Sequence, residues 1–142
     1  MAILNYTTKI DSAKTVGEIQ SMLGAKGAKS VSAQYANGEV VAFLFSIDIQ
    51  NQPVNFRLPC NWEGVLRSFK SDRNVPRSSE TKEQAQRTAW RIVKDWVEAQ
   101  LAIIESGQAE MAEVFLPYAM TGTGQTCYQL LASRPQLLLG NE

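Results

Sequence analysis

The sequence predicts an α+β fold: a helix, a three-stranded antiparallel sheet, a second helix, a long central helix and short C-terminal helices. Between residues 31 and 58, apolar and polar residues alternate in three successive stretches, which is the period of strands with one buried face. Before and after these stretches, apolar residues recur at helical spacing. The length of 142 residues suits a single domain, with a helix–sheet–helix layer over 1–69 and a helical part over 78–142.

The first helix is predicted from a start signal and an apolar face. Thr15 and Glu18 stand three residues apart, as in a capping box, so we expect the helix to begin at Thr15. Either Gly24 or Gly27 is expected to end it. The apolar residues between these points share one face: Val16, Ile19, Met22 and Leu23.

The pairing of the first two strands follows from which face each apolar residue occupies. A two-residue turn at Asn37-Gly38 would place Phe43 on the opposite face from Val31. We therefore expect a three-residue loop at 36–38, which pairs Val31 directly with Phe43. The alternating apolar residues of the three strands are Val31, Ala33 and Tyr35, then Val41, Phe43, Phe45, Ile47 and Ile49, then Val54, Phe56 and Leu58.

The second hairpin is expected to turn at Asn51-Gln52, which pairs Ile49 with Val54. The opposite face of the sheet is polar. Arg57 projects from that face, and a cross-strand ion pair with Asp48 would explain it without any function. The polar-face residues are Ser32, Gln34, Ser46, Asp48, Asn55 and Arg57.

A second helix follows Pro59, with Asn61 as its N-cap. Its apolar stripe predicts packing on the sheet. The connection over 70–78 is polar and basic, so we expect it to be the most mobile segment. The stripe consists of Trp62, Val65, Leu66 and Phe69.

The long helix is expected to begin after Ser78, Ser79 or Thr81 and to extend to about residue 105. On a helical wheel its apolar residues cover roughly two thirds of the circumference, which predicts packing partners on two sides. Gln100 lies within that apolar arc. A buried amide needs hydrogen-bond partners, so we expect Gln100 to bind backbone groups rather than a ligand.

The C-terminal part combines short helices with a glycine-bearing loop, Thr121–Gly124. This loop opens a helix, so its amides could hold an anion, although a simple turn with a helix cap needs no ligand. The apolar tail Leu137–Leu139 is expected to dock on its own domain or on a neighbouring subunit, and a homo-oligomer is therefore expected.

Composition limits the chemistry. The chain has no histidine, and Cys60 and Cys127 do not form a metal-binding or redox motif, so both are expected to be free thiols. We find no catalytic constellation, metal site or cofactor motif and expect a protein that is not an enzyme. The chain starts without a signal-peptide pattern and has no apolar run of membrane length, so we expect a cytoplasmic setting without membrane insertion.

Charge is unevenly distributed although the net charge is zero. Residues 57–94 hold nine bases and four acids (net +5), whereas residues 95–142 hold one base and six acids (net −5). This asymmetry indicates either an anionic partner for the basic segment or two segments that face each other.

Seven basic residues form the candidate ligand site, because arginines can grip phosphate groups through two hydrogen bonds. The alternative is a solvated face held by local pairs, such as Arg91 with Asp95 and Lys94 with Glu98. The candidate residues are Arg67, Lys70, Arg73, Arg77, Arg87, Arg91 and Lys94.

Four segments together resemble a family of small, uncharacterised proteins encoded by tailed phages and prophages: Phe56–Pro59, Ala89–Gln100, Val114–Tyr118 and Leu137–Gly140. The likeness spans nearly the whole chain. It implies the cytoplasm of a bacterial host and an accessory role for the phage. The family has no assigned functional residues, so no role is carried over to any position here.

These observations lead to the expectation of a non-enzymatic phage accessory binding protein. It would antagonise host defence, either by sequestering a nucleotide signal or by blocking a defence protein. The alternatives are a nucleic-acid-binding factor of phage DNA metabolism that uses the basic 57–94 segment, and an oligomeric scaffold. Fold analogy alone would not decide between them.

Overall fold

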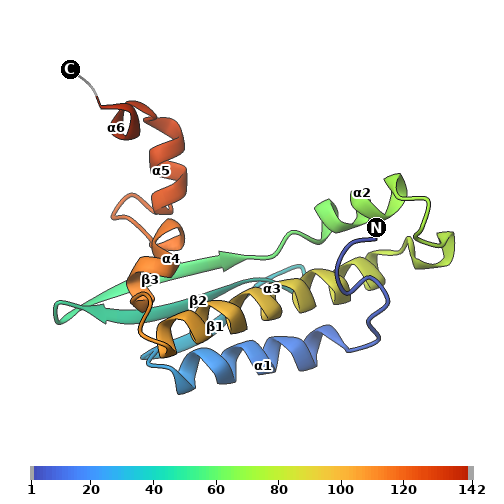
Figure 1. Cartoon of the computed structure of the whole chain (residues 1–142), viewed down its shortest axis with the longest axis horizontal. Helices are drawn as coiled ribbons and strands as arrows, with labels where there is room; N and C mark the ends of the chain where they lie inside the picture. Colours follow the sequence, from blue (N-terminus) through green and yellow to red (C-terminus); the bar gives the residue numbers. More distant parts are fainter. Residues whose placement is uncertain (1, 141–142) are drawn as a thin grey trace.

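The computed structural model of the chain describes residues 2–140 and confirms the α+β order (Figure 1). None of the helices in these residues combines the length and the apolar character needed to cross a bilayer. The elements are α1 (Ser12–Ala25), β1 (Ser30–Ala36), β2 (Glu39–Ile49), β3 (Gln52–Pro59), α2 (Trp62–Ser71), η1 (Arg77–Ser79), α3 (Lys82–Glu105), α4 (Met111–Phe115), η2 (Leu116–Tyr118), α5 (Cys127–Ser133) and α6 (Gln136–Leu139).

The main core lies between one face of the sheet and the helices. Phe43 meets Trp90 of α3 edge to face, with ring centroids 5.2 Å apart. Phe45 stacks on Phe56 at 5.2 Å and meets Phe115 edge to face at 5.4 Å. These five rings are almost fully buried. Each such pair adds about 0.5–1.5 kcal/mol beyond the burial of its apolar area.

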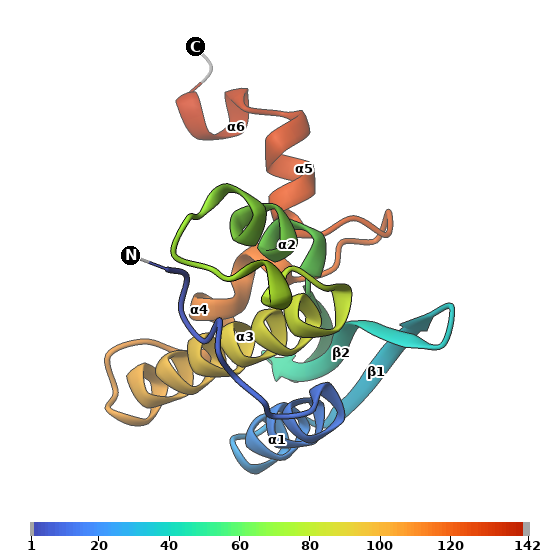
Figure 2. The same cartoon turned by 90° about the vertical axis from the view of Figure 1, so that its right-hand side faces the viewer.

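Helix α3 is central, as its wide apolar arc predicts. In Figure 2, where α3 runs obliquely across the picture, helix α1 and the sheet lie on one side of it and α2 lies on another. Val97 and Leu101 belong to the main core with the sheet, whereas Ala85 and Ala89 belong to a second cluster with α2. The expectation of packing partners on two sides is confirmed.

The expectation that α2 packs on the sheet is wrong. Val65 and Phe69 of α2 pack instead on α3, where Ala85 and Ala89 let the two helices approach closely. Val75 from the following connection completes this second cluster and is 4% exposed. The connection expected to be mobile is therefore anchored by a buried valine.

The predicted loop of the first hairpin is also wrong. Asn37-Gly38 forms a two-residue turn in which both residues have positive φ (53° and 80°). The apolar residues of β1 and β2 still lie on the same face of the sheet. Val41 has no partner in β1, and this extra residue shifts the strand register by one. Val31 consequently pairs with Phe45 and not with Phe43. A β-bulge preserves the face that we expected a longer loop to preserve.

The second hairpin turns one residue earlier than expected. Gln50-Asn51 forms the turn, with φ of 51° and 63°, and Val54 pairs with Ile47. A turn at Asn51-Gln52 would place Pro53 in the closing pair, where an N–H group has to donate. In the observed register Pro53 occupies the next position, which is not hydrogen-bonded, so its missing N–H costs nothing.

Helix α1 begins three residues before the predicted capping box, at Ser12 after Asp11. Thr15 lies inside the helix and is fully buried. The prediction that a glycine ends this helix is confirmed at Gly27, whose φ of 114° is typical of the residue that follows a helix. The expected caps of α2 and α3 are confirmed, since Asn61 accepts from Gly64 N and Thr81 accepts from Gln84 N, each at 3.2 Å.

Truncating the buried valine tests whether it anchors the α2–α3 connection. Val75→Ala should lower the free energy of unfolding by about 1–2 kcal/mol, because it leaves a cavity between α2 and α3. Urea unfolding followed by circular dichroism measures this. Arg77→Ala, in the same connection but exposed, is the control and should leave stability nearly unchanged. Equal stability of Val75→Ala and the wild type would show that the connection is not anchored.

Candidate functional site

The seven predicted basic residues do not form one patch. Arg67 and Lys70 lie on α2, and Arg73 and Arg77 lie in the connection after it; all four are exposed. Helix α2 covers the side of α3 that bears Ala85 and Ala89. The remaining three basic residues project from other sides of α3 and are partly buried: Arg87, Arg91 and Lys94.

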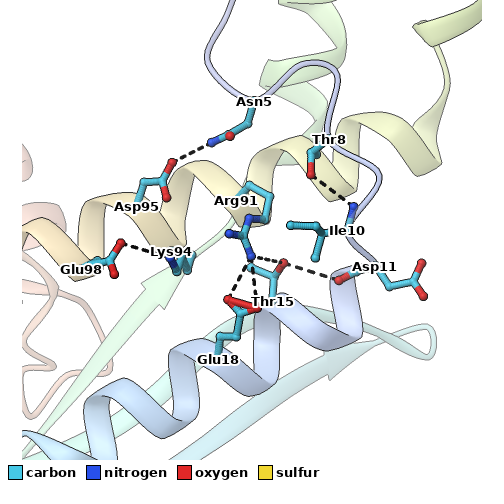
Figure 3. A network of polar contacts seen from close by, with 10 residues as sticks. All are labelled: Asn5, Thr8, Ile10, Asp11, Thr15, Glu18, Arg91, Lys94, Asp95 and Glu98. Atoms are coloured by element: carbon cyan, nitrogen blue, oxygen red, sulfur yellow. Dashed lines mark hydrogen bonds and ion pairs between the residues drawn. The ribbon is translucent and has the colours of Figure 1, made fainter.

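Arg91 is part of the interface between α3 and α1 (Figure 3). Its Nη1 donates to both carboxylate oxygens of Glu18, at 3.0 and 3.3 Å, and lies 3.4 Å from the Thr15 hydroxyl. The Arg91 side chain is 14% exposed and that of Glu18 is 33% exposed. Thr15 and Glu18 lie inside α1, so neither serves as a helix cap, and Glu18 instead pairs with Arg91 across the interface.

The other two candidate basic residues of α3 also have partners on the helix. Lys94 pairs with Glu98 at 3.1 Å, as expected for residues four apart. Arg87 donates to Gln84 Oε1 at 2.7 and 3.1 Å. The expected pair of Arg91 with Asp95 is not formed; Asp95 instead accepts from Asn5 Nδ2 at 2.8 Å (Figure 3).

The glutamine that binds backbone groups is Gln84 and not Gln100. Gln84 Nε2 donates to the carbonyl oxygens of Tyr6 and Thr8, both at 2.8 Å, which fastens the N-terminal segment to α3. Gln100 is only half-buried. The expectation of an enclosed Gln100 amide is therefore wrong, because its part of the helical arc reaches the surface.

A groove of about 380 Å³ lies between β3, η2 and the start of α5. Arg57 lines it, and its Nε donates to Gln34 Oε1 at 2.9 Å, so the ion pair expected with Asp48 is replaced by a neutral acceptor on β1. The side chains around Arg57 are aromatic, cyclic or polar and uncharged: Pro59, Pro117, Tyr118, Thr126, Tyr128 and Gln129.

A smaller apolar pocket of about 240 Å³ adjoins this groove and shares Pro59 and Tyr118 with it. The pocket reaches Trp96 of α3, whose ring meets Tyr118 edge to face at 5.7 Å. Trp96 also contacts Phe115, at 5.6 Å. We call the two spaces together the aromatic groove; Arg57 lines the larger space and Trp96 the smaller one.

The C-terminal arm, residues 127–140, comprises α5 and α6 and projects away from the body in both views (Figures 1 and 2). The Thr121–Gln125 loop before it closes on itself, because Thr121 N and Oγ1 both donate to the Gln125 carbonyl. Leu137, Leu138 and Leu139 are 57%, 72% and 80% exposed. The apolar tail does not dock on its own domain, the first of the two positions expected for it.

Burial lowers the reactivity expected of one thiol. Cys60 lies between the two hydrophobic clusters, and burial raises its pKa to about 12. Its thiolate, the nucleophilic form, is therefore scarce at neutral pH. Within residues 2–140 no group of three or more Cys, Asp or Glu side chains is placed to hold a metal ion.

Comparisons with family models, curated proteins and solved structures give no match to this chain. The resemblance to phage proteins stays a prediction. The candidate site is therefore defined by geometry alone, as the aromatic groove and the arm beside it. The signals for it in the sequence were the terminal leucine run and the prolines and tyrosines near it.

The Arg91–Glu18 pair should stabilise the α1–α3 interface. Glu18→Gln should lower the free energy of unfolding by about 1–2 kcal/mol, since Arg91 keeps its charge in a mostly buried position. Glu105→Gln is the matched control, because the Lys26–Glu105 pair also joins α1 to α3 at 2.6 Å but is exposed. Chemical denaturation compares the two variants. Similar losses would mean that burial of the Arg91 pair adds nothing.

The raised pKa of Cys60 predicts slow alkylation and pH-dependent stability. In a Cys127→Ser background, iodoacetamide at pH 8 should label Cys60 far more slowly in the folded protein than in urea. The folded pKa exceeds the ordinary value of 9.0, so the stability from burying the neutral thiol is complete below pH 9 and falls as the pH rises towards 12. Mass spectrometry of the labelled protein checks the rate; equal rates in both states would contradict it.

Proposed function

We propose that this chain is a non-enzymatic binding protein whose C-terminal arm and aromatic groove hold a protein partner. One observation carries the proposal. In the described residues seven large apolar side chains are more than half exposed, and five of them lie between residues 116 and 139. Exposed apolar groups gathered in one region favour an interaction site over an ordinary solvated surface.

The residue types of this surface support a protein partner. Tryptophan, tyrosine and arginine supply most of the binding energy in protein interfaces, and Trp96, Tyr118, Tyr128 and Arg57 line the aromatic groove. Tyr128 is 66% exposed at the base of the arm. The groove suits an apolar segment of the partner, with a carboxylate placed near the Arg57 guanidinium.

The proposed biological setting comes from the resemblance to phage proteins. The chain would act in the cytoplasm of a bacterial host and antagonise defence by blocking a defence protein. Sequestering a nucleotide signal is less favoured. Arg87, Arg91 and Lys94 have partners within the chain, and the exposed basic residues of α2 lie on a different side of α3.

A charged residue on the arm should abolish capture of the partner. Tagged wild type, Leu138→Asp and Arg73→Ala are expressed in the bacterial host, and the proteins that co-purify are quantified by mass spectrometry. We expect a bacterial protein that is retained by wild type and by Arg73→Ala but lost with Leu138→Asp.

With that protein purified, calorimetry should show binding weakened at least about tenfold by Leu138→Asp, because a carboxylate then faces an apolar contact. Arg73→Ala should bind like the wild type. The proposal fails if every retained protein is retained equally by all three forms.

Nucleic acids and nucleotide second messengers should bind poorly. Mobility shifts with DNA and RNA at low salt, and thermal shifts with a panel of cyclic nucleotides, should both be flat, because the seven basic residues do not form one patch. A shift that weakens steeply with salt and is lost in Arg67→Ala/Arg73→Ala would overturn the preference for a protein partner.

A further inference from the structure

The outer edge of β1 is an unprotected edge strand. The strand order is β1-β2-β3, so β1 has a single paired neighbour among residues 2–140. The opposite edge of the sheet is partly covered, because Ala119 bridges Phe56 and Met120 N donates to the Asn55 carbonyl at 2.7 Å. Free edges expose unpaired N–H and C=O groups that can pair with another strand.

Monomeric proteins commonly protect such an edge with charges, prolines or bulges. The seven residues of β1, Ser-Val-Ser-Ala-Gln-Tyr-Ala, include neither a charge nor a proline. The bulge of this hairpin lies in β2, at Val41, so β1 itself stays regular. Nothing in the strand opposes pairing with a further strand.

Tyr35 is the second unusual feature of this edge. It is 64% exposed, although it lies on the face of the sheet that the helices cover. It lines a groove of about 460 Å³ with Val16 and Gly17 of α1 and with Trp90. Tyr35 is therefore a large, mostly exposed ring on the strand at the free edge of the sheet.

The part of α1 beside this edge is small and uncharged. Ala13, Gly17 and Gln20 line the same groove, and a side chain at Gly17 or Gly24 would meet open space. The nearest carboxylate of the groove, Glu39, is bound by Lys82 at 2.7 Å and by Gln86, and these hydrogen bonds lower its pKa. The layer above β1 therefore presents no unpaired charge from these residues.

We infer that β1 pairs antiparallel with β1 of a second copy of this chain, which gives a six-stranded sheet across a twofold axis at Ala33. A twofold axis perpendicular to a sheet makes edge pairing antiparallel and places each residue opposite its symmetry equivalent. With Ala33 on the axis, Tyr35 of one copy lies opposite Val31 of the other. The symmetry repeats this pair, so it occurs twice in the interface. This aromatic–β-branched pair gives the exposed Tyr35 ring an apolar neighbour.

The polar face matches in the same register. Ser32 of one copy lies opposite Gln34 of the other. Both residues are uncharged, and Gln34 Oε1 accepts from Arg57 within its own copy. Lys29, the next charge along the chain, then lies beside the uncharged Asn37-Gly38 turn of the other copy. No like charges therefore face each other within the strand pair, and this self-complementary register favours a second copy as the occupant of the edge. The interface is separate from the arm and goes beyond the proposed function.

Two measurements test the inference. In a Cys60→Ser/Cys127→Ser background, Ala33→Cys should form a disulfide-linked dimer on mild oxidation, because residues paired on the axis lie about 5.5 Å apart. Ser32→Cys is the matched control and should cross-link far more slowly, since residue 32 lies opposite residue 34. Sedimentation velocity of the full chain should show a concentration-dependent dimer.

Tyr35→Lys should weaken that dimer about tenfold or more, because two cross-strand pairs are lost by symmetry. Tyr35 is exposed, so this variant should fold normally, as circular dichroism will confirm. Leu138→Asp, on the arm, should leave the dimer intact. A chain that is monomeric at all concentrations, a dimer unaffected by Tyr35→Lys, or a dimer lost only with Leu138→Asp would each overturn the inference.

Discussion

The fold depends on covering one face of a thin sheet. Three strands form a single layer, and its inner face carries Phe43, Phe45 and Phe56, which are buried. A sheet of this size is not stable until that face is packed against other elements. Helices α1 and α3 lie across it, and Phe115 of α4 closes one end. The N-terminal segment and α2 are then attached to α3 rather than to the sheet.

Most of the architecture could be predicted from periodicity, whereas the strand register could not. Alternation of apolar residues correctly assigned the strands and their inner face. It does not determine the pairing, since any shift by two residues preserves that face. The pairing was decided by a bulge at Val41 and by the N–H group that Pro53 lacks. The effect of the missing N–H of Pro53 could have been predicted from the sequence. The bulge could not, because nothing in the local sequence distinguishes Val41 from Val40 as the unpaired residue.

The charged residues show a related limit. Counting charges identified a basic segment, and helical spacing correctly predicted the pair Lys94–Glu98. The partner of Arg91 is Glu18, 73 positions away, and no local pattern indicates it. The choice between Gln84 and Gln100 likewise depended on where the N-terminal segment lies. The tail was the part of the candidate site that the sequence indicated, because a terminal run of leucines is expected to dock on another surface.

Long-range attachment to α3 also has a consequence for synthesis on the ribosome. The chain makes α1 and the whole sheet first, yet Trp90, Val97 and the partners of Asn5, Thr15 and Glu18 all belong to α3. Until α3 has emerged, the nascent chain carries an uncovered phenylalanine face together with a free strand edge. Such species are prone to aggregate and are recognised by chaperones. For this protein, the interval before α3 emerges is when translation speed and chaperone supply matter most.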